Sequence, residues 1–151
     1  MVRIKKSKLI QKANTSNFRK QLIKYVQTNK CCVDIMCQHP KHQSDAVVHN
    51  KFKVFKKSIE QELKLNVNKM WVYYVKKGET IEPKWHTHGS VISCLLYITD
   101  SNLGTKFENF DVELSKNNWL IWNKDIKHTP EPGYNKKDRI VIAGMLNETS
   151  I

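Results

Sequence analysis

The sequence predicts one α+β domain that is mainly β, with two amino-terminal helices before a β-rich carboxy-terminal part. Two amphipathic segments precede residue 65, with apolar side chains at three- and four-residue intervals. Short runs rich in β-branched and aromatic residues follow, and turn-forming residues separate them. This order favours helices that buttress one face of a curled sheet or double-sheet barrel. We expect a single domain over 1–151, with a basic, mainly helical part at 1–64 and a β core at 65–147.

The two predicted helices each have one apolar face. Asn14 or Ser16 is expected to cap the first helix, which ends near Asn29, because short polar side chains accept hydrogen bonds from free N–H groups. Its apolar residues are Phe18, Leu22, Ile23 and Val26. Ser44 or Asp45 is expected to cap the second helix. Its apolar residues are Val48, Phe52, Phe55, Ile59 and Leu63.

The carboxy-terminal half is expected to be antiparallel β structure. The predicted strands are Met70–Val75, Val91–Thr99, Phe107–Leu114, Trp119–Trp122 and Ile140–Met145. Turn signals between them lie at 77–78, 102–104, 116–118 and 130–133. Short connections of this kind join neighbouring antiparallel strands.

The charge of the chain points to anionic partners. The formal net charge is +12, and residues 1–30 contain nine Lys or Arg and no Asp or Glu. A basic surface can bind nucleic acid through counterion release, although solvated helix faces are also often basic.

The distribution of apolar residues and cysteines indicates an intracellular, cytoplasmic protein. No apolar run approaches the length of a membrane span, and residues 1–30 lack the apolar stretch of a secretory signal. The four cysteines include an adjacent pair and lack a secreted context, so reduced thiols are expected.

Three histidines are candidate metal ligands. His86 and His88 are two residues apart, so on an extended strand both side chains project to the same face and can chelate one ion. His128, forty-two residues beyond His86, opens the loop before the last strand and is the best candidate for a third ligand. Taken alone, a His-x-His pair also fits surface or hydrogen-bonded histidines.

The wider pattern resembles the Fe(II)/2-oxoglutarate oxygenases, and within them the prolyl-hydroxylase-like branch and small phage-type oxygenases. The resemblance covers residues 68–147 and rests on the stretches PKWHTHGSVISCLLYI (83–98), NWLIWNKDIKH (118–128) and DRIVIA (138–143). It implies a double-stranded β-helix, a jelly-roll or cupin-like barrel, behind the two helices.

The resemblance also implies roles for individual residues. His86 and His128 correspond to the family's iron-binding histidines, and Arg139 to the arginine that binds the far carboxylate of 2-oxoglutarate. A guanidinium suits this role because it can donate two parallel hydrogen bonds to a carboxylate. Tyr97, which closes the strand after the histidine pair, corresponds to a tyrosine that helps bind the same carboxylate.

The chain departs from the family at position 88. The family pattern is His-x-Asp or His-x-Glu, which provides two histidines and one carboxylate, whereas this chain has His88. We expect His86, His88 and His128 to form a catalytic metal site of three histidines with less negative charge. The alternative is that a carboxylate completes the site, and the candidates are Glu82, Glu108 and Asp111.

The function implied by the resemblance is a hydroxylase that uses Fe(II), 2-oxoglutarate and O2. A protein or peptide is the first expected substrate, and nucleic acid bound through the basic amino-terminal region is the second. Two alternatives remain open: a cupin-type three-histidine metalloenzyme that does not use 2-oxoglutarate, and a non-catalytic barrel that binds a partner.

Overall fold

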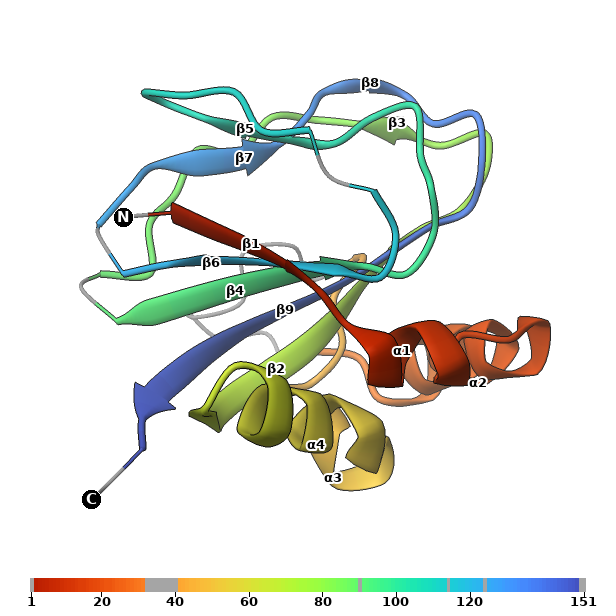
Figure 1. Cartoon of the computed structure of the whole chain (residues 1–151). Helices are drawn as coiled ribbons and strands as arrows, with labels where there is room; N and C mark the ends of the chain where they lie inside the picture. Colours follow the sequence, from red (N-terminus) through yellow and green to blue (C-terminus); the bar gives the residue numbers. More distant parts are fainter. Residues whose placement is uncertain (1, 32–40, 90, 114, 124, 150–151) are drawn as a thin grey trace.

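The computed structural model describes residues 2–31, 41–89, 91–113, 115–123 and 125–149 (Figure 1). The helices are α1 (Lys8–Ala13), α2 (Ser16–Thr28), α3 (Val48–Lys51) and α4 (Lys53–Glu62). The strands are β1 (Val2–Lys6), β2 (Leu65–Val75), β3 (Thr80–Ile81), β4 (Ile92–Tyr97), β5 (Thr105–Phe107), β6 (Asn118–Trp122), β7 (His128–Pro130), β8 (Gly133–Tyr134) and β9 (Arg139–Glu148). Among the described residues, no helix has the length and apolar character needed to cross a membrane.

The elements form three layers around one antiparallel main sheet. The main sheet has five strands in the order β1-β6-β4-β9-β2. Two short antiparallel ribbons, β3-β8 and β5-β7, lie over one face of it. The helical layer, α1 to α4, lies against the other face, chiefly against β2 (Figure 1). The expectation of a mainly β chain with few helices is therefore confirmed.

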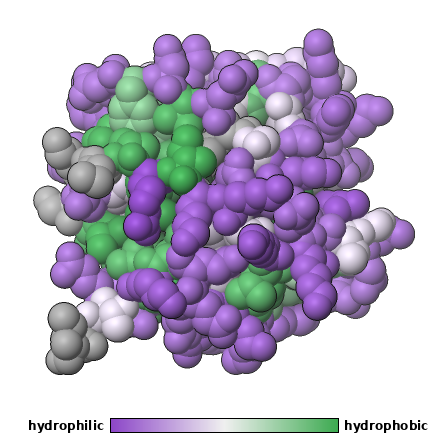
Figure 2. Space-filling view, viewed as in Figure 1, coloured by the Kyte–Doolittle hydropathy of each residue, from purple (hydrophilic) through white to green (hydrophobic). Residues whose placement is uncertain are grey.

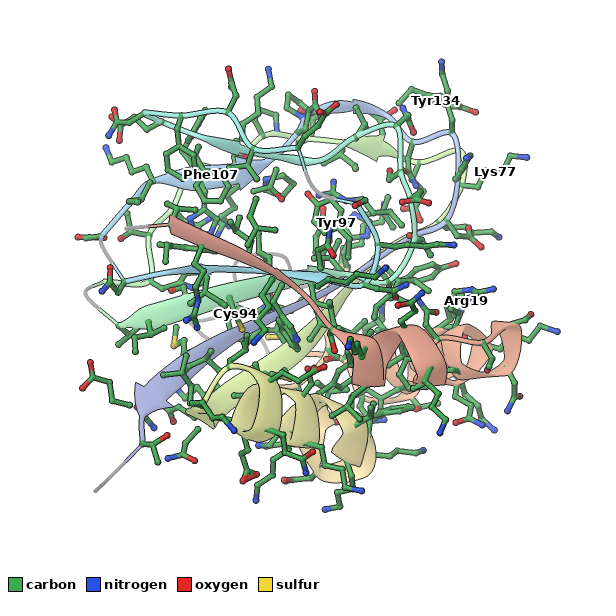
Figure 3. All side chains as sticks on the ribbon, in the orientation of Figure 1. Arg19, Lys77, Cys94, Tyr97, Phe107 and Tyr134 are labelled. Carbon is green, nitrogen blue, oxygen red and sulfur yellow. The ribbon has the colours of Figure 1, made fainter. Side chains whose placement is uncertain are left out.

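The two faces of the main sheet support separate apolar cores, because successive side chains of a strand point to opposite faces. On β9, Ile142 packs in the core shared with the helical layer, whereas Val141 packs with Phe107 under the ribbons. Figure 3 shows Cys94 on the helical side, and Tyr97 and Phe107 on the ribbon side. This alternation decides which β9 residues can reach a site under the ribbons.

The helices differ in detail from the prediction. The cap of α2 is Thr15, whose hydroxyl accepts from the Phe18 N–H at 3.2 Å, so the prediction of Asn14 or Ser16 is wrong by one residue. Asn14 instead donates to the Ile98 carbonyl and to Asn117.

The second predicted helix is two helices that meet at Phe52, and no side chain caps either of them. Ser44 does not cap a helix. Its backbone N–H donates to the Val72 carbonyl, and its hydroxyl accepts from the Val72 N–H, each at 2.9 Å. The segment around Ser44 therefore extends the edge of the main sheet beside β2. A further difference is the six-residue helix α1, which was not predicted.

The strands also show differences. Of the predicted strand 107–114, only Phe107 lies in a strand among the described residues, because pairing of β5 with β7 ends at Phe107 and His128. The strands β1, β3, β7 and β8 were not predicted, and His128 lies on β7 rather than in a loop. The expectation of reduced thiols is wrong for Cys31, which is disulfide-bonded. Cys94 is a buried free thiol.

Candidate metal centre

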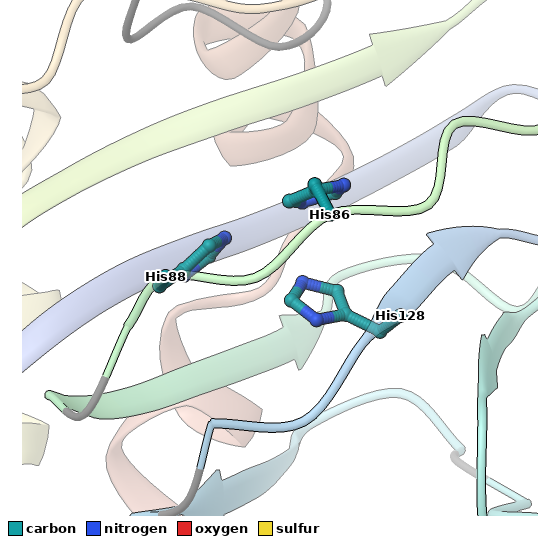
Figure 4. Close-up of side chains that lie close together, drawn as sticks. All are labelled: His86, His88 and His128. Atoms are coloured by element: carbon teal, nitrogen blue, oxygen red, sulfur yellow. The ribbon is translucent and has the colours of Figure 1, made fainter.

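Three histidines from two separate segments meet on the ribbon side of the main sheet. His86 and His88 lie in the connection between β3 and β4, and His128 begins β7 (Figure 4). Two backbone hydrogen bonds, His86 N–H to His128 O and His128 N–H to His86 O, both 3.0 Å, join these segments. The ligand nitrogens of the three side chains lie within 4.8 Å of one another. The structure thus brings together the predicted ligands.

Backbone carbonyls orient two of the three imidazoles. His86 Nδ1 is 2.8 Å from the Lys84 carbonyl oxygen, and His128 Nδ1 is 3.1 Å from the Ile126 carbonyl oxygen. A carbonyl can only accept, so Nδ1 carries the proton in each ring and the Nε2 lone pair is available for a metal. His88 Nδ1 lies 3.4 Å from the Ser93 hydroxyl.

Burial keeps the imidazoles neutral. Burial, followed by the charges of His128 and His86, lowers the pKa of His88 to about 3. Burial and the charge of His86 lower the pKa of His128 to about 4, against the opposing effect of the Ile126 carbonyl. Burial also lowers the pKa of His86. At neutral pH all three rings are therefore in the unprotonated form that metal binding requires.

The three carboxylates considered as alternative ligands do not join this group. Glu82, Glu108 and Asp111 are all exposed. In the described part of the chain, the cluster with metal-binding geometry contains the three histidines alone. A group of three neutral imidazoles could hold Fe(II) or another first-row divalent ion.

The three histidines line a cavity of about 240 Å³. The cavity lies between the β5-β7 ribbon and the side of β2 and β9 that faces this ribbon. Its other lining residues are Gln43, Trp71, Tyr73, Thr87, Leu95, Thr105, Pro130, Arg139, Val141, Ala143 and Met145. None of these side chains is acidic, and most are apolar. The cavity is therefore mostly apolar with a few polar groups, as is usual for small-molecule sites.

Arg139 is the cation of this cavity. Its side chain is 2% exposed, and Nη2 donates to the Gly104 carbonyl at 2.6 Å. Its Nε and Nη1 atoms are buried and have no hydrogen-bond partner among the described residues. The guanidinium lies 5.5 Å from the centre of the Tyr73 ring and 5.8 Å from that of Tyr97. Unpaired donors of a buried cation are costly, so the arrangement suits an anionic ligand.

Tyr97 lies beside Arg139 but is not among the residues that line the cavity. Its hydroxyl forms a 2.8 Å hydrogen bond with the Thr105 hydroxyl, and Thr105 does line the cavity. Direct contact of Tyr97 with a carboxylate therefore stays a prediction.

Sequence reasoning missed Gln43 and Thr105. Gln43 precedes the segment that carries the family resemblance and reaches the cavity only because it pairs with Tyr73 at the edge of β2. No sequence signal marks that pairing, and Thr105 lies in a predicted turn-to-strand region without a distinctive motif.

Comparison with solved structures shows the fold. A viral collagen prolyl hydroxylase from Paramecium Bursaria Chlorella virus-1, in complex with 2-oxoglutarate, matches with a TM-score of 0.59 and 8% identity over 99% of this chain and 96% of that chain. HygX from Streptomyces hygroscopicus, with nickel and 2-oxoglutarate bound, matches with a TM-score of 0.64 and 10% identity over 98% and 82%. This chain has the fold of the 2-oxoglutarate oxygenases.

A third oxygenase of this fold was solved with a peptide. The prolyl hydroxylase from Trichoplax adhaerens, in complex with a hypoxia inducible factor peptide fragment, matches with a TM-score of 0.61 and 13% identity over 97% of this chain and 83% of that chain. No protein-family model matches the sequence, and no curated protein matches it. The resemblance to 2-oxoglutarate oxygenases is thus supported by structure rather than by overall sequence similarity.

Proposed function

We propose that this protein is an Fe(II)- and 2-oxoglutarate-dependent hydroxylase built on a double-stranded β-helix. One observation carries the proposal: a cluster of three neutral histidines lines the same cavity as a buried arginine, two of whose donors have no partner in the described part of the chain. The histidines fit a metal, and the arginine fits the far carboxylate of a dicarboxylic acid. The fold shared with 2-oxoglutarate oxygenases supports the same proposal.

Each residue of the candidate site would have its own role in the reaction. His86, His88 and His128 would hold the iron, which when bound supplies the activation of O2 that couples 2-oxoglutarate decarboxylation to substrate hydroxylation. Arg139 would orient the cosubstrate by its far carboxylate, with Tyr97 beside it. The apolar cavity walls would exclude water. The overall balance is substrate C–H, 2-oxoglutarate and O2 giving substrate C–OH, succinate and CO2.

The substrate proposed first is a peptidyl side chain. Trp85 precedes His86 and is 52% exposed, which offers an apolar contact next to the candidate metal centre. Trp71 lines the cavity itself and lies 5.7 Å from the His88 ring. The peptide complex of the Trichoplax adhaerens enzyme shows that a protein of this fold can hold such a substrate.

A basic helical layer supports nucleic acid as a second partner. Lysines on α1, α2 and α4 are exposed, and hydrophilic residues cover most of this side in Figure 2. The exposed lysines are Lys8, Lys12, Lys20, Lys24, Lys53, Lys56 and Lys57. Fluorescence anisotropy of a labelled oligonucleotide at 50 and 200 mM salt tests this idea. Binding that is absent at both salt concentrations would remove nucleic acid from the proposal.

The direct test of the proposed function is succinate formation. Protein reconstituted with Fe(II) should convert 2-oxoglutarate to succinate in air, and a peptide that is a substrate should increase the rate. His128→Ala should abolish turnover, whereas His49→Gln, which removes a histidine from the remote helix α3, should retain it. Equal turnover by the wild type and His128→Ala would refute the proposal.

The all-histidine donor set also favours a second candidate, a cupin-type enzyme that does not use 2-oxoglutarate. Arg139→Ala distinguishes the two. In a 2-oxoglutarate oxygenase this substitution should greatly reduce turnover. Intact turnover of a substrate without succinate formation would favour the cupin-type enzyme. Stoichiometric iron without any O2 uptake would favour a non-catalytic binding protein.

A further inference from the structure

The cavity has an unusual charge balance. Among its lining residues are the three histidines of the candidate metal centre and one buried arginine, but no Asp or Glu. The ion pair seen in the described part of the chain, between Lys41 and Glu79, does not involve Arg139. With neutral imidazoles, the side chains that line the cavity contribute one positive charge and no negative charge; the carboxylate of Glu131 accepts from the Gly104 N–H but does not line the cavity.

The surroundings of His88 do not make up for the missing carboxylate. Its ring lies 5.7 Å from Trp71, 6.5 Å from Trp122 and 4.8 Å from His128, measured between centroids. Among the described residues, its ring hydrogen-bonds to the neutral Ser93 hydroxyl at 3.4 Å. A divalent ion held by three neutral rings would keep its full charge of two, in a cavity of low polarity that already contains Arg139.

An anion with a carboxylate at each end can compensate both positive charges, that of the metal ion and that of Arg139. One end can neutralise the ion at the histidines, and the other can pair with the two unpaired donors of Arg139. Without it, metal and guanidinium repel each other across an apolar space, where charges are poorly screened. With it, each cation gains a counter-charge. Metal and dicarboxylate should therefore each strengthen the binding of the other, by the same factor.

We propose that His88 makes divalent-metal binding depend on a dicarboxylate such as 2-oxoglutarate. The inference rests on the proposed function, because it assumes metal at the three histidines and 2-oxoglutarate at Arg139. A carboxylate at position 88 would supply a permanent negative charge and weaken this dependence. The protein would then retain metal when the cosubstrate is present and release it when the cosubstrate is absent.

The experiment measures metal affinity without turnover. Mn(II) is titrated into metal-free protein under argon, with and without saturating 2-oxoglutarate, and free Mn(II) is followed by electron paramagnetic resonance. For the wild type we expect 2-oxoglutarate to increase Mn(II) affinity about 100-fold, near the upper end of usual couplings. For His88→Asp the increase should fall to about tenfold or less, because Mn(II) binds more tightly without 2-oxoglutarate.

A second substitution distinguishes the removal of a repelling charge from general damage to the site. Arg139→Gln removes the repelling cation, so it should strengthen Mn(II) binding in the absence of 2-oxoglutarate while reducing the coupling. General damage to the site would instead weaken Mn(II) binding. His88→Glu provides a longer carboxylate in case Asp does not reach the ion, and circular dichroism compares the folds of the variants.

The outcomes separate this inference from the proposed function. If Mn(II) binds and His128→Ala removes it, but 2-oxoglutarate changes affinity less than threefold, the coupling inference is wrong and the metal site stands. The inference is also wrong if the coupling is as large in His88→Asp and His88→Glu as in the wild type. If His128→Ala leaves Mn(II) binding unchanged, the metal site and the proposed function both fail.

Discussion

Arg139→Met tests whether the buried guanidinium binds the far carboxylate of the cosubstrate. Methionine retains an unbranched side chain at this buried position but has no charge and no donor. In the wild type, Nε and Nη1 are available to two carboxylate oxygens, because neither has a partner among the described residues. A hydrogen bond to a charged group contributes about 1.5–3 kcal/mol. Losing two such bonds should weaken 2-oxoglutarate binding by at least about 3 kcal/mol, or roughly 150-fold.

The assay is isothermal titration calorimetry under argon, with Mn(II)-loaded protein and two ligands. The first ligand is 2-oxoglutarate, and the second is 2-oxobutanoate, which keeps the 2-oxo acid end but lacks the far carboxylate. Wild type should strongly prefer 2-oxoglutarate, and Arg139→Met should bind both ligands with similar, weak affinity. This double-mutant cycle isolates the contact between guanidinium and carboxylate.

The matched control is Arg3→Met, which makes the same substitution at an exposed arginine on β1. It should leave both affinities unchanged. If Arg139→Met still prefers 2-oxoglutarate as strongly as the wild type does, the far carboxylate does not bind at Arg139. A loss of affinity for both ligands by equal factors would point to structural damage and would also refute the reasoning.

Three further predictions concern the metal site and the stability of the fold. His128→Ala should abolish tight iron binding, because only His86 and His88 would remain as ligands. Iron content is measured by atomic absorption spectrometry, and undiminished iron would contradict this prediction. Metal-free protein should lose stability as pH falls from about 6.5 to about 4, because His128 is neutral when folded and the unfolded chain binds more protons in that window. Above about pH 6.5, His128 should not affect the free energy of unfolding measured with urea. Between about pH 6.5 and 4 this free energy should fall by up to about 3 kcal/mol. A free energy of unfolding that does not change with pH in this range would contradict a buried neutral His128. Ser58→Ala should destabilise the protein by about 1–3 kcal/mol, because it removes the acceptor, at 2.8 Å, of the buried Trp119 N–H, and an unchanged thermal midpoint would contradict this expectation.

Local patterns were enough to predict the broad architecture. The apolar spacing of residues 18–26 predicts α2 because a helix turns every 3.6 residues. The β-branched residues within 140–145 predict the strand β9 because they fit a pleated sheet well. The break at Phe52 was not predictable in this way, because the apolar face continues through it and the two helices separate only in the packed structure.

Part of the candidate site could also be predicted. The two-residue spacing of His86 and His88 gives a shared face from local geometry alone. The position of His128 before the last strand made it the best third ligand, and the family resemblance supplied Arg139. The sequence left open whether a histidine or an exposed carboxylate such as Glu82 completes the cluster. The proximity of the three side chains depends on which segments pair: two backbone hydrogen bonds join residues 86 and 128, and the three histidines lie together while Glu82 is exposed. A metal site of three histidines therefore stays a prediction that this arrangement supports.

The sequence by itself determined the amphipathic faces of the helices, the strands rich in β-branched residues, the basic amino-terminal region and the histidine pair. Each of these depends on residues within a few positions of one another. Only the tertiary structure decided that Gln43 joins the cavity and that, among the described residues, no acidic side chain lines it and two buried donors of Arg139 have no partner. These properties depend on the register of hydrogen bonds between segments far apart in the chain, and the physical reason is that such pairing is set by the packing of the whole molecule.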